Sequence, residues 1–133
     1  MNLDQEWLKA SNDDLKTISK ILDFDDLSHI VAFHAQQSIE KSFKAIMESE
    51  KIKIPKEHNL FKLKNFVKDT LEINNDDLLD TLNQLYIDSR YPSEFGLLPD
   101  GKPTTEEAQE FYEFALSIYE QVKNILEKGN IKS

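Results

Sequence analysis

The chain has 133 residues, of which 39% are hydrophobic and 31% charged, with three glycines and four prolines. This composition excludes a disordered chain, which is poorer in apolar residues, and a membrane protein, which is poorer in charge. The lack of cysteine excludes disulfides, a thiolate nucleophile and cysteine-ligated metals. The first residues are polar and acidic, unlike a signal peptide, and no apolar run approaches the ~20 residues of a membrane span. We expect one cytoplasmic domain over residues 1–133 with no membrane contact.

The charge is unevenly divided along the chain. The net charge is −9, but residues 41–68 hold eight lysines against three glutamates, which leaves the remainder of the chain strongly acidic. An acidic surface repels a nucleic-acid backbone and a basic one attracts it. Residues 41–68 therefore form either a phosphate-facing surface or a set of lysines that neutralise the protein's own carboxylates.

Helical periodicity dominates the first half of the sequence. Apolar residues recur at steps of three and four from Leu3 to Leu22, interrupted once by Ser11, which predicts a first helix. A second helix is expected to begin with a cap at residue 25, 26 or 28 and to end near Ser49. Its buried stripe comprises Ala32, Ala35, Ile39, Phe43 and Ile46. The two alanines allow a neighbouring helix to approach closely.

Three further helices are expected after Pro55. A third carries Leu60, Leu63, Val67 and Leu71, and a short fourth follows the polar run 74–77 and ends before Pro92. The last begins with a capping box at Thr104 and Glu107 and is expected to end at Gly129 in a left-handed turn. No strand-like alternation exceeds residues 51–54. The prediction is an all-α, up-and-down helical bundle of four main helices plus one short helix.

Polar residues gather on the second helix beside its apolar stripe. Gln37, Lys41 and Lys44 share one face by their spacing, and Gln36 and Glu40 share an adjacent one. Glu40 precedes Lys44 by four residues, the favourable order for a helical ion pair. This is either a solvated polar side or a network in which partly buried glutamines find hydrogen-bond partners.

The segment Tyr86 to Pro92 contains Arg90, the single arginine of the chain, next to Tyr91. A guanidinium group offers a planar fork of donors that suits a carboxylate or a phosphate, which lysine cannot imitate. Arg90 therefore either binds a ligand at two points or bonds to a carboxylate or carbonyl of its own protein.

Several of these motifs together resemble the HEPN family (higher eukaryotes and prokaryotes nucleotide-binding). They are FHAQQSIEKSFKAI in the second helix, Pro55, His58-Asn59-Leu60, Ser89-Arg90-Tyr91-Pro92, the alanines at 108 and 115, and Trp7 with Asp14-Leu15. The resemblance covers nearly the whole chain. It implies a helical bundle that commonly dimerises, binds nucleotides or RNA, and often works with a minimal nucleotidyltransferase, as in toxin–antitoxin pairs. The stripe of Tyr112, Tyr119 and Leu126 also favours a homodimer.

The resemblance also bears on catalysis. Many family members are metal-independent endoribonucleases that use an arginine and a histidine separated from it by four to six intervening residues. Arg90 corresponds to that arginine, but the histidine positions hold Phe95, Gly96 and Leu97. RNA cleavage needs a group that transfers protons near neutral pH, and histidine is the usual one. We therefore expect a non-catalytic module that binds a nucleotide or RNA phosphate or a nucleotidyltransferase partner. The alternatives are an RNase toxin with an atypical site around Arg90 and a purely structural docking dimer.

The expected ligand-binding residues are Gln37, Lys41, Lys44, Arg90 and Tyr91. The lysines supply point charges, Arg90 a two-point phosphate contact and Tyr91 a surface for base stacking. Among the histidines, His34 is expected to pack or lie in an interface, His58 to cap the third helix and His29 to be exposed.

The sequence predicts no cofactor or metal. It has neither a glycine-rich phosphate loop nor a histidine-based helical metal motif. The acidic pairs 25–26 and 76–77 are better explained as caps at helix ends than as metal ligands.

Overall fold

The computed structural model of the protein describes the backbone of residues 2–90 and 102–132 and the side chains of residues 2–87 and 102–129. The helices in the described residues are α1 (Leu3–Ile21), the 3₁₀ helix η1 (Asp25–Leu27), α2 (Ser28–Ser49), α3 (Leu60–Val67), α4 (Asp76–Arg90) and α5 (Thr105–Lys132). The predicted all-α bundle with four main helices and one short helix is confirmed. Within these residues, no helix combines the length and the apolar character that crossing a membrane requires.

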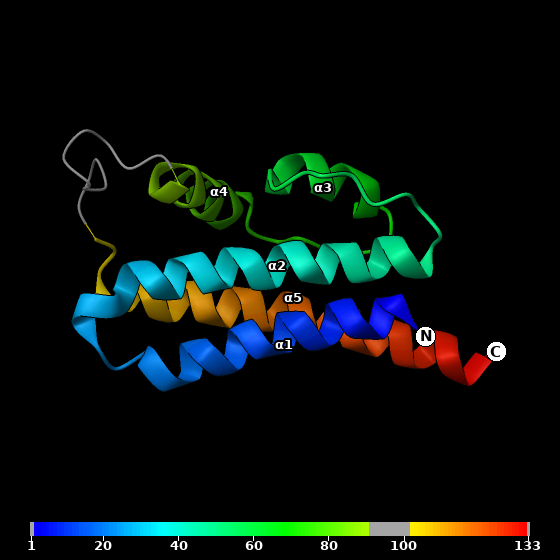
Figure 1. Ribbon diagram of the computed structural model, residues 1–133, viewed down its shortest axis with the longest axis horizontal. Helices are drawn as coiled ribbons and strands as arrows, with labels where there is room; N and C mark the ends of the chain where they lie inside the picture. Colours follow the sequence, from blue (N-terminus) through cyan, green and yellow to red (C-terminus); the bar gives the residue numbers. More distant parts are fainter. Residues whose placement is uncertain (1, 91–101, 133) are drawn as a thin grey trace.

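Helix α2 is the centre of the bundle. It packs against α1, α3, α4 and α5. Figure 1 shows α1 and α5 below α2 and the pair α3 and α4 above it, with α1 running antiparallel to α2. Because neighbours cover α2 on two sides, its polar residues are buried unless they lie on the strip left open between α1 and the α3–α4 pair.

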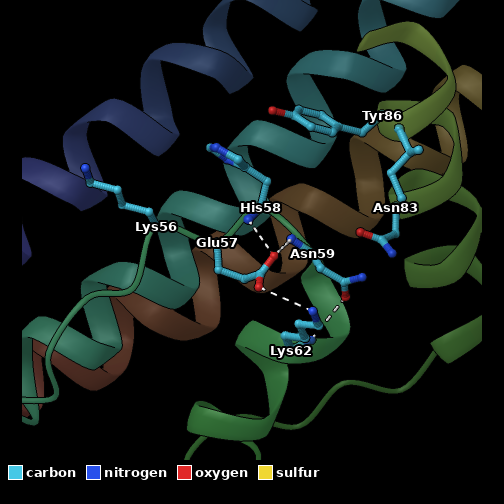
Figure 2. Close-up of a pocket in the computed structure, with 8 residues that line it drawn as sticks. Lys56, Glu57, His58, Asn59, Lys62, Asn83 and Tyr86 are labelled. Carbon is cyan, nitrogen blue, oxygen red and sulfur yellow. Dashed lines mark hydrogen bonds and ion pairs between the residues drawn. The ribbon is translucent and has the colours of Figure 1, made fainter. Parts of the chain in front are cut away.

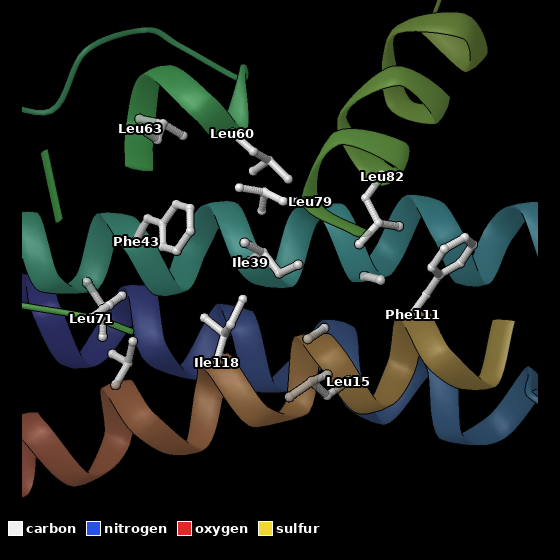
Figure 3. Close-up of a cluster of buried hydrophobic side chains, with 14 of the residues drawn as sticks. Leu15, Ile39, Phe43, Leu60, Leu63, Leu71, Leu79, Leu82, Phe111 and Ile118 are labelled. Carbon is white, nitrogen blue, oxygen red and sulfur yellow. The ribbon is translucent and has the colours of Figure 1, made fainter. Parts of the chain in front are cut away.

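The core lies along both sides of α2. Large side chains that are fully buried come from all five α-helices, and Figure 3 shows many of them meeting around Ile39 and Phe43. The predicted stripes of α2 and α5 point inward, with Ala35 and Ala115 at 0% exposure. Burial at about 25 cal/mol per Å² of apolar surface makes this core the main stabilising contribution.

Ser11 explains the break in the apolar stripe of α1. Its hydroxyl lies 2.8 Å from the hydroxyls of Ser38 and Ser42 and donates to the carbonyl oxygen of Ser38 at 2.8 Å. All three serines are fully buried. Small side chains that satisfy one another let α1 and α2 approach closely, so the apparent interruption is a packing contact.

Two of the predicted caps are confirmed. The Glu107 N–H donates to Thr104 Oγ1 at 3.0 Å, and the Thr104 N–H donates to Glu107 Oε1 at 2.9 Å. At α4, the Leu78 N–H donates to Asn75 Oδ1 at 3.0 Å. These bonds satisfy backbone donors that the first turn of a helix leaves unpaired.

The predicted side-chain cap of α2 was wrong, although the helix begins at Ser28, within the predicted range. Residues 25–27 form η1, and no side chain caps α2. The proposed capping residues serve a tertiary contact instead: Ser28 Oγ donates to the Pro103 carbonyl at 2.6 Å, and Asp25 Oδ1 accepts from Thr105 Oγ1 at 2.9 Å. The start of α5 is thereby attached to the α1–α2 corner.

Two predicted helix ends were also wrong. Helix α3 ends at Val67, and Leu71 reaches the core from the following turn, where it is 4% exposed. Helix α5 continues past Gly129 to Lys132. A glycine costs only about 1 kcal/mol in a helix, and no proline follows it, so nothing forces a left-handed turn there.

Candidate functional site

A strip of polar side chains follows the open side of α2. His34, Gln37 and Lys41 occupy successive turns of the helix, and all three are partly exposed. Of the predicted ligand-binding residues, Gln37 and Lys41 therefore lie together at the surface. We call these three residues the polar strip.

A buried carboxylate from α1 holds the two ends of the polar strip. Asp14 is 7% exposed, and its Oδ1 lies 2.8 Å from Nδ1 of His34, while Oδ2 accepts from Nζ of Lys41 at 2.8 Å. Because a carboxylate only accepts hydrogen bonds, Nδ1 of His34 is the nitrogen that carries the proton. Nε2 of His34 and two of the three N–H groups of Lys41 are left for a ligand.

A second buried carboxylate, that of Glu40, belongs to α2 itself. The Glu40 side chain is 5% exposed; its Oε2 accepts from Nζ of Lys44 at 3.0 Å, and its Oε1 lies 3.0 Å from Nδ1 of His58. The predicted ion pair between Glu40 and Lys44 is thus present. Each buried carboxylate binds one lysine and one histidine through different oxygens.

Lys44 occupies a different environment from the one expected for a ligand-binding lysine. Its side chain is 7% exposed, and Nζ also lies 5.4 Å from the centre of the Trp7 ring, a cation–π distance. The structure therefore separates the two lysines: Lys41 reaches the surface, and Lys44 neutralises Glu40 inside the bundle.

The glutamine pair forms the network that its apolar neighbours indicated. Gln36 is fully buried, and its Nε2 donates to the carbonyl oxygen of His58 at 3.1 Å. Nε2 of Gln37 donates to Oε1 of Gln36 at 2.7 Å. The chain segment before α3 is thereby fixed to α2, and Gln37 is oriented beside Lys41.

A shallow pocket of about 240 Å³ opens between the segment before α3 and the second half of α4. Figure 2 shows Lys56, Glu57, His58, Asn59, Lys62, Asn83 and Tyr86 around it. Oε1 of Glu57 accepts from the backbone N–H groups of His58 and Asn59 at 3.1 and 3.0 Å. These bonds, that of Asn59 foremost, lower the pKa of Glu57, so its carboxylate stays ionised.

The basic segment 41–68 divides into two groups. Four lysines lie within ion-pair distance of carboxylates: Lys41 with Asp14, Lys44 with Glu40, Lys62 with Glu57 and Lys64 with Asp76. The other four, at 51, 53, 56 and 68, are exposed. The reading in which lysines neutralise the protein's own carboxylates therefore holds for the first group, and the reading of a phosphate-facing surface stays a prediction.

The histidines differ from expectation in two cases. Asn59, not His58, caps α3, because its Oδ1 accepts from the N–H groups of Phe61 and Lys62. His29 is partly buried where exposure was expected, and its Nδ1 is buried with no hydrogen-bond partner among the described residues. Burial, together with the Lys102 ammonium, lowers the pKa of His29. His34, expected to pack, does so against Phe33 and Asp14.

The remaining predicted site residues, Arg90 and Tyr91, lie at the end of α4 and directly after it. Arg90 is the last residue of α4, one turn after Tyr86, and its side chain is outside the described residues. Tyr91, and the positions 95–97 where the family histidine would stand, also lie outside them. Among the described residues, no group of three or more histidine, cysteine or acidic side chains could hold a metal ion.

Sequence reasoning missed the two carboxylates that organise this region. Asp14 was recognised only as part of a family pattern, and Glu40 only as a partner of Lys44. A signal for Asp14 was present: it follows Trp7 by seven residues and Ser11 by three, which places it on the border of the apolar stripe of α1.

Comparison with known proteins agrees with the fold and the motifs. The family model of the HEPN domain matches residues 5–125. The crystal structure of TT1696 from Thermus thermophilus superposes with a TM-score of 0.75 at 24% identity, covering 93% of this chain and 98% of that one. A search of curated proteins finds no match.

Proposed function

Because this chain belongs to the HEPN domain family, we propose that it is a non-catalytic module that binds the phosphate of a nucleotide or of RNA along the polar strip of α2. The observation that carries the proposal is the position of Lys41. Its ammonium is fixed at the surface by the buried Asp14 and keeps N–H groups for a further acceptor. A cation that is already oriented loses little entropy on binding an anion.

The polar strip supplies the donors for such an anion. Lys41 contributes charge and N–H groups, and Gln37 lies one turn away from it, whereas the Asp14 contact leaves Nε2 of His34 as an acceptor. Arg90 completes the proposal as a two-point phosphate contact and Tyr91 as a stacking surface. Lys44 is not part of this surface, because its ammonium is paired with the buried Glu40 inside the bundle.

Partners follow from the family resemblance. We propose a cytoplasmic homodimer that acts with a minimal nucleotidyltransferase, as one half of a toxin–antitoxin pair. Co-expression with the protein encoded next to it, followed by size-exclusion chromatography with light scattering, tests both associations. A monomer that elutes apart from that protein would contradict them.

Binding to RNA is tested by fluorescence anisotropy with a labelled single-stranded 12-mer and with nucleoside triphosphates as competitors. We expect Lys41→Gln to weaken binding and to lower the salt slope by about 0.7 for the lost contact to a single strand. Lys16→Gln, an exposed lysine on α1, is the matched control and leaves both values unchanged. A wild-type protein that binds neither RNA nor nucleotide refutes the proposal.

A second function, endoribonuclease activity, is favoured by one observation. His34 and His58 each have Nδ1 held by a buried carboxylate, which leaves Nε2 as the free nitrogen. A general base has this arrangement, and it offers a substitute for the missing family histidine. Cleavage of RNA that is lost in Arg90→Ala and in either His34→Gln or His58→Gln would establish it. Wild-type protein that leaves RNA intact under conditions where an active family member cuts it would exclude it.

A further inference from the structure

Three aromatic rings form a row beside the pocket. The ring of Tyr86 stacks on Phe33 with centroids 5.9 Å apart and planes inclined by 8°, and on His58 at 5.8 Å and 28°. The rings come from three different parts of the chain: α2, α4 and the segment before α3. We call Phe33, Tyr86 and His58 the ring row.

The ring row has a covered centre and open ends. Tyr86 is 8% exposed, whereas the side chain of His58 is 49% exposed. Figure 2 shows the His58 ring next to Tyr86, and both residues line the pocket. An aromatic surface left in water at a pocket mouth is apolar area that a planar ligand can cover.

The exposed ring is also held rigidly. Nδ1 of His58 is bound by the buried Glu40, and the His58 carbonyl oxygen accepts from Gln36. Ring orientation is therefore fixed before any ligand arrives, and binding does not have to restrict it further. A histidine that served only as a hydrogen-bond partner of Glu40 would not need its ring aligned with Tyr86.

The pocket wall next to the ring offers both kinds of hydrogen-bonding group. Asn83 uses Oδ1 to accept from the Leu60 N–H at 3.0 Å, which fixes the amide and leaves Nδ2 as a donor. Glu57 is an acceptor fixed by backbone N–H groups. The edges of nucleobases carry donors and acceptors side by side. Lys56 and Lys62 also line the pocket and supply positive charge.

We propose that the pocket beside the ring row is a subsite for one unpaired nucleobase, which stacks on His58 while Asn83 and Glu57 contact its edge. Its volume of about 240 Å³ lies below the roughly 300–1,000 Å³ of sites for larger ligands, so it suits a base and not a whole nucleotide. The inference rests on the proposed function. In addition to the phosphate bound by the polar strip, it assigns a binding site to the uncharged base of the same ligand. It also predicts that paired bases, which are already stacked, are excluded.

Two substitutions separate stacking from the structural role of His58. His58→Asn keeps an N–H donor for Glu40 near the position of Nδ1 and removes the ring. His58→Tyr keeps an aromatic ring and removes that donor. If the ring binds a base, His58→Asn should no longer bind ligands with a base more tightly than ligands without one. His58→Tyr should keep that preference. The matched control is Phe66→Ala, because Phe66 is an exposed aromatic residue, 46% exposed, on α3 outside the ring row.

Each ligand with a base is compared with its counterpart without one. Calorimetric titration uses a nucleoside monophosphate against ribose 5-phosphate, and a single-stranded RNA 8-mer against the same 8-mer with abasic sites. We expect the ligands with bases to bind about five-fold or more tightly, the usual range for base stacking on an aromatic ring. His58→Asn should abolish this ratio, and His58→Tyr and Phe66→Ala should preserve it. A preference for the base in the mononucleotide pair indicates a free nucleotide as ligand, and a preference seen only in the 8-mer pair indicates RNA.

The failures of the two proposals look different. If ligands with and without bases bind equally well to the wild type, phosphate binding stands and the base subsite is refuted. A base-dependent ratio that survives His58→Asn places the base elsewhere and also refutes it. If none of the four ligands binds, the proposed function fails, and the subsite fails with it.

Discussion

Asp14 and Lys41 face each other across the α1–α2 interface, with Nζ of the lysine 2.8 Å from Oδ2 of the aspartate. The aspartate side chain is 9% exposed and the lysine side chain 25% exposed, so the anion lies inside the bundle and the cation at its surface. Both carboxylate oxygens are paired, which is the condition under which a buried charge is tolerated. The position of the proposed phosphate-binding lysine is thus set by a residue 27 positions earlier in the chain.

Asp14→Asn is expected to lower the free energy of unfolding by about 1.5–3 kcal/mol, the range for hydrogen bonds to charged groups. The amide has one acceptor oxygen for two donors, so either His34 or Lys41 loses its partner. Urea denaturation measures the change. Asp13→Asn, on the exposed side of the same turn, should stay within about 0.5 kcal/mol of wild type. Equal effects of the two substitutions would show that Asp14 is not a structural anchor.

Glu40→Gln is expected to cost more, about 3–5 kcal/mol, because it leaves the Lys44 ammonium buried without a counter-charge. The double variant Glu40→Gln with Lys44→Met should recover part of that loss, since it removes the uncompensated charge and keeps a long apolar side chain beside Trp7. Chemical denaturation of the wild type, both single variants and the double variant gives the coupling energy. Additive effects would contradict the pairing.

Asn59→Ala is expected to destabilise the protein by about 0.5–2 kcal/mol through loss of the α3 cap. Asn65→Ala makes the same chemical change at an exposed position inside α3, where alanine is the better helix former, and should be neutral or slightly stabilising. Thermal unfolding followed by circular dichroism compares them. If Asn65→Ala were as harmful as Asn59→Ala, the cap would not be the cause.

His29 predicts a pH dependence of stability with a defined sign. Burial and the nearby Lys102 lower its pKa in the folded state from the ordinary value of 6.5, with Asp26 opposing. The unfolded chain therefore binds a proton at a higher pH than the folded protein does. Stability is complete above about pH 6.5 and falls as the pH drops through the folded-state pKa. Relative to His29→Gln, the wild type should lose unfolding temperature as the pH is lowered below about 6.5. If the unfolding temperatures of the wild type and His29→Gln changed with pH in parallel, His29 would not be the source of the pH dependence.

Ser11→Leu is expected to destabilise by about 1–3 kcal/mol or more, because the residue is fully buried against Ser38 and Ser42 and leaves no room for a larger side chain. Ser19→Leu, an exposed serine of α1, is the control and should change stability little. Denaturant unfolding of both variants measures the difference. A tolerated leucine at position 11 would mean that α1 and α2 are not closely packed there.

The sequence predicted those features that depend on neighbours along the chain. The stripe of α5 and the box of Thr104 with Glu107 are read from residues three and four apart, because a helix brings such residues together whatever surrounds it. The pair Glu40 and Lys44 was predictable for the same reason. The lack of a side-chain cap on α2 and the end of α3 were not predictable, since tertiary contacts there compete with the local preferences.

The sequence by itself determined an all-α bundle of the HEPN type, the helices that build it and the missing family histidine, because periodicity and motif spacing are properties of the chain alone. Only the tertiary structure decided which of two similar lysines reaches the surface. Lys41 and Lys44 lie one turn apart on one helix, yet α1 places Asp14 beneath the first, while Glu40 and Trp7 enclose the second. Burial depends on which helices cover a given turn, and that is settled by packing between segments distant in the chain.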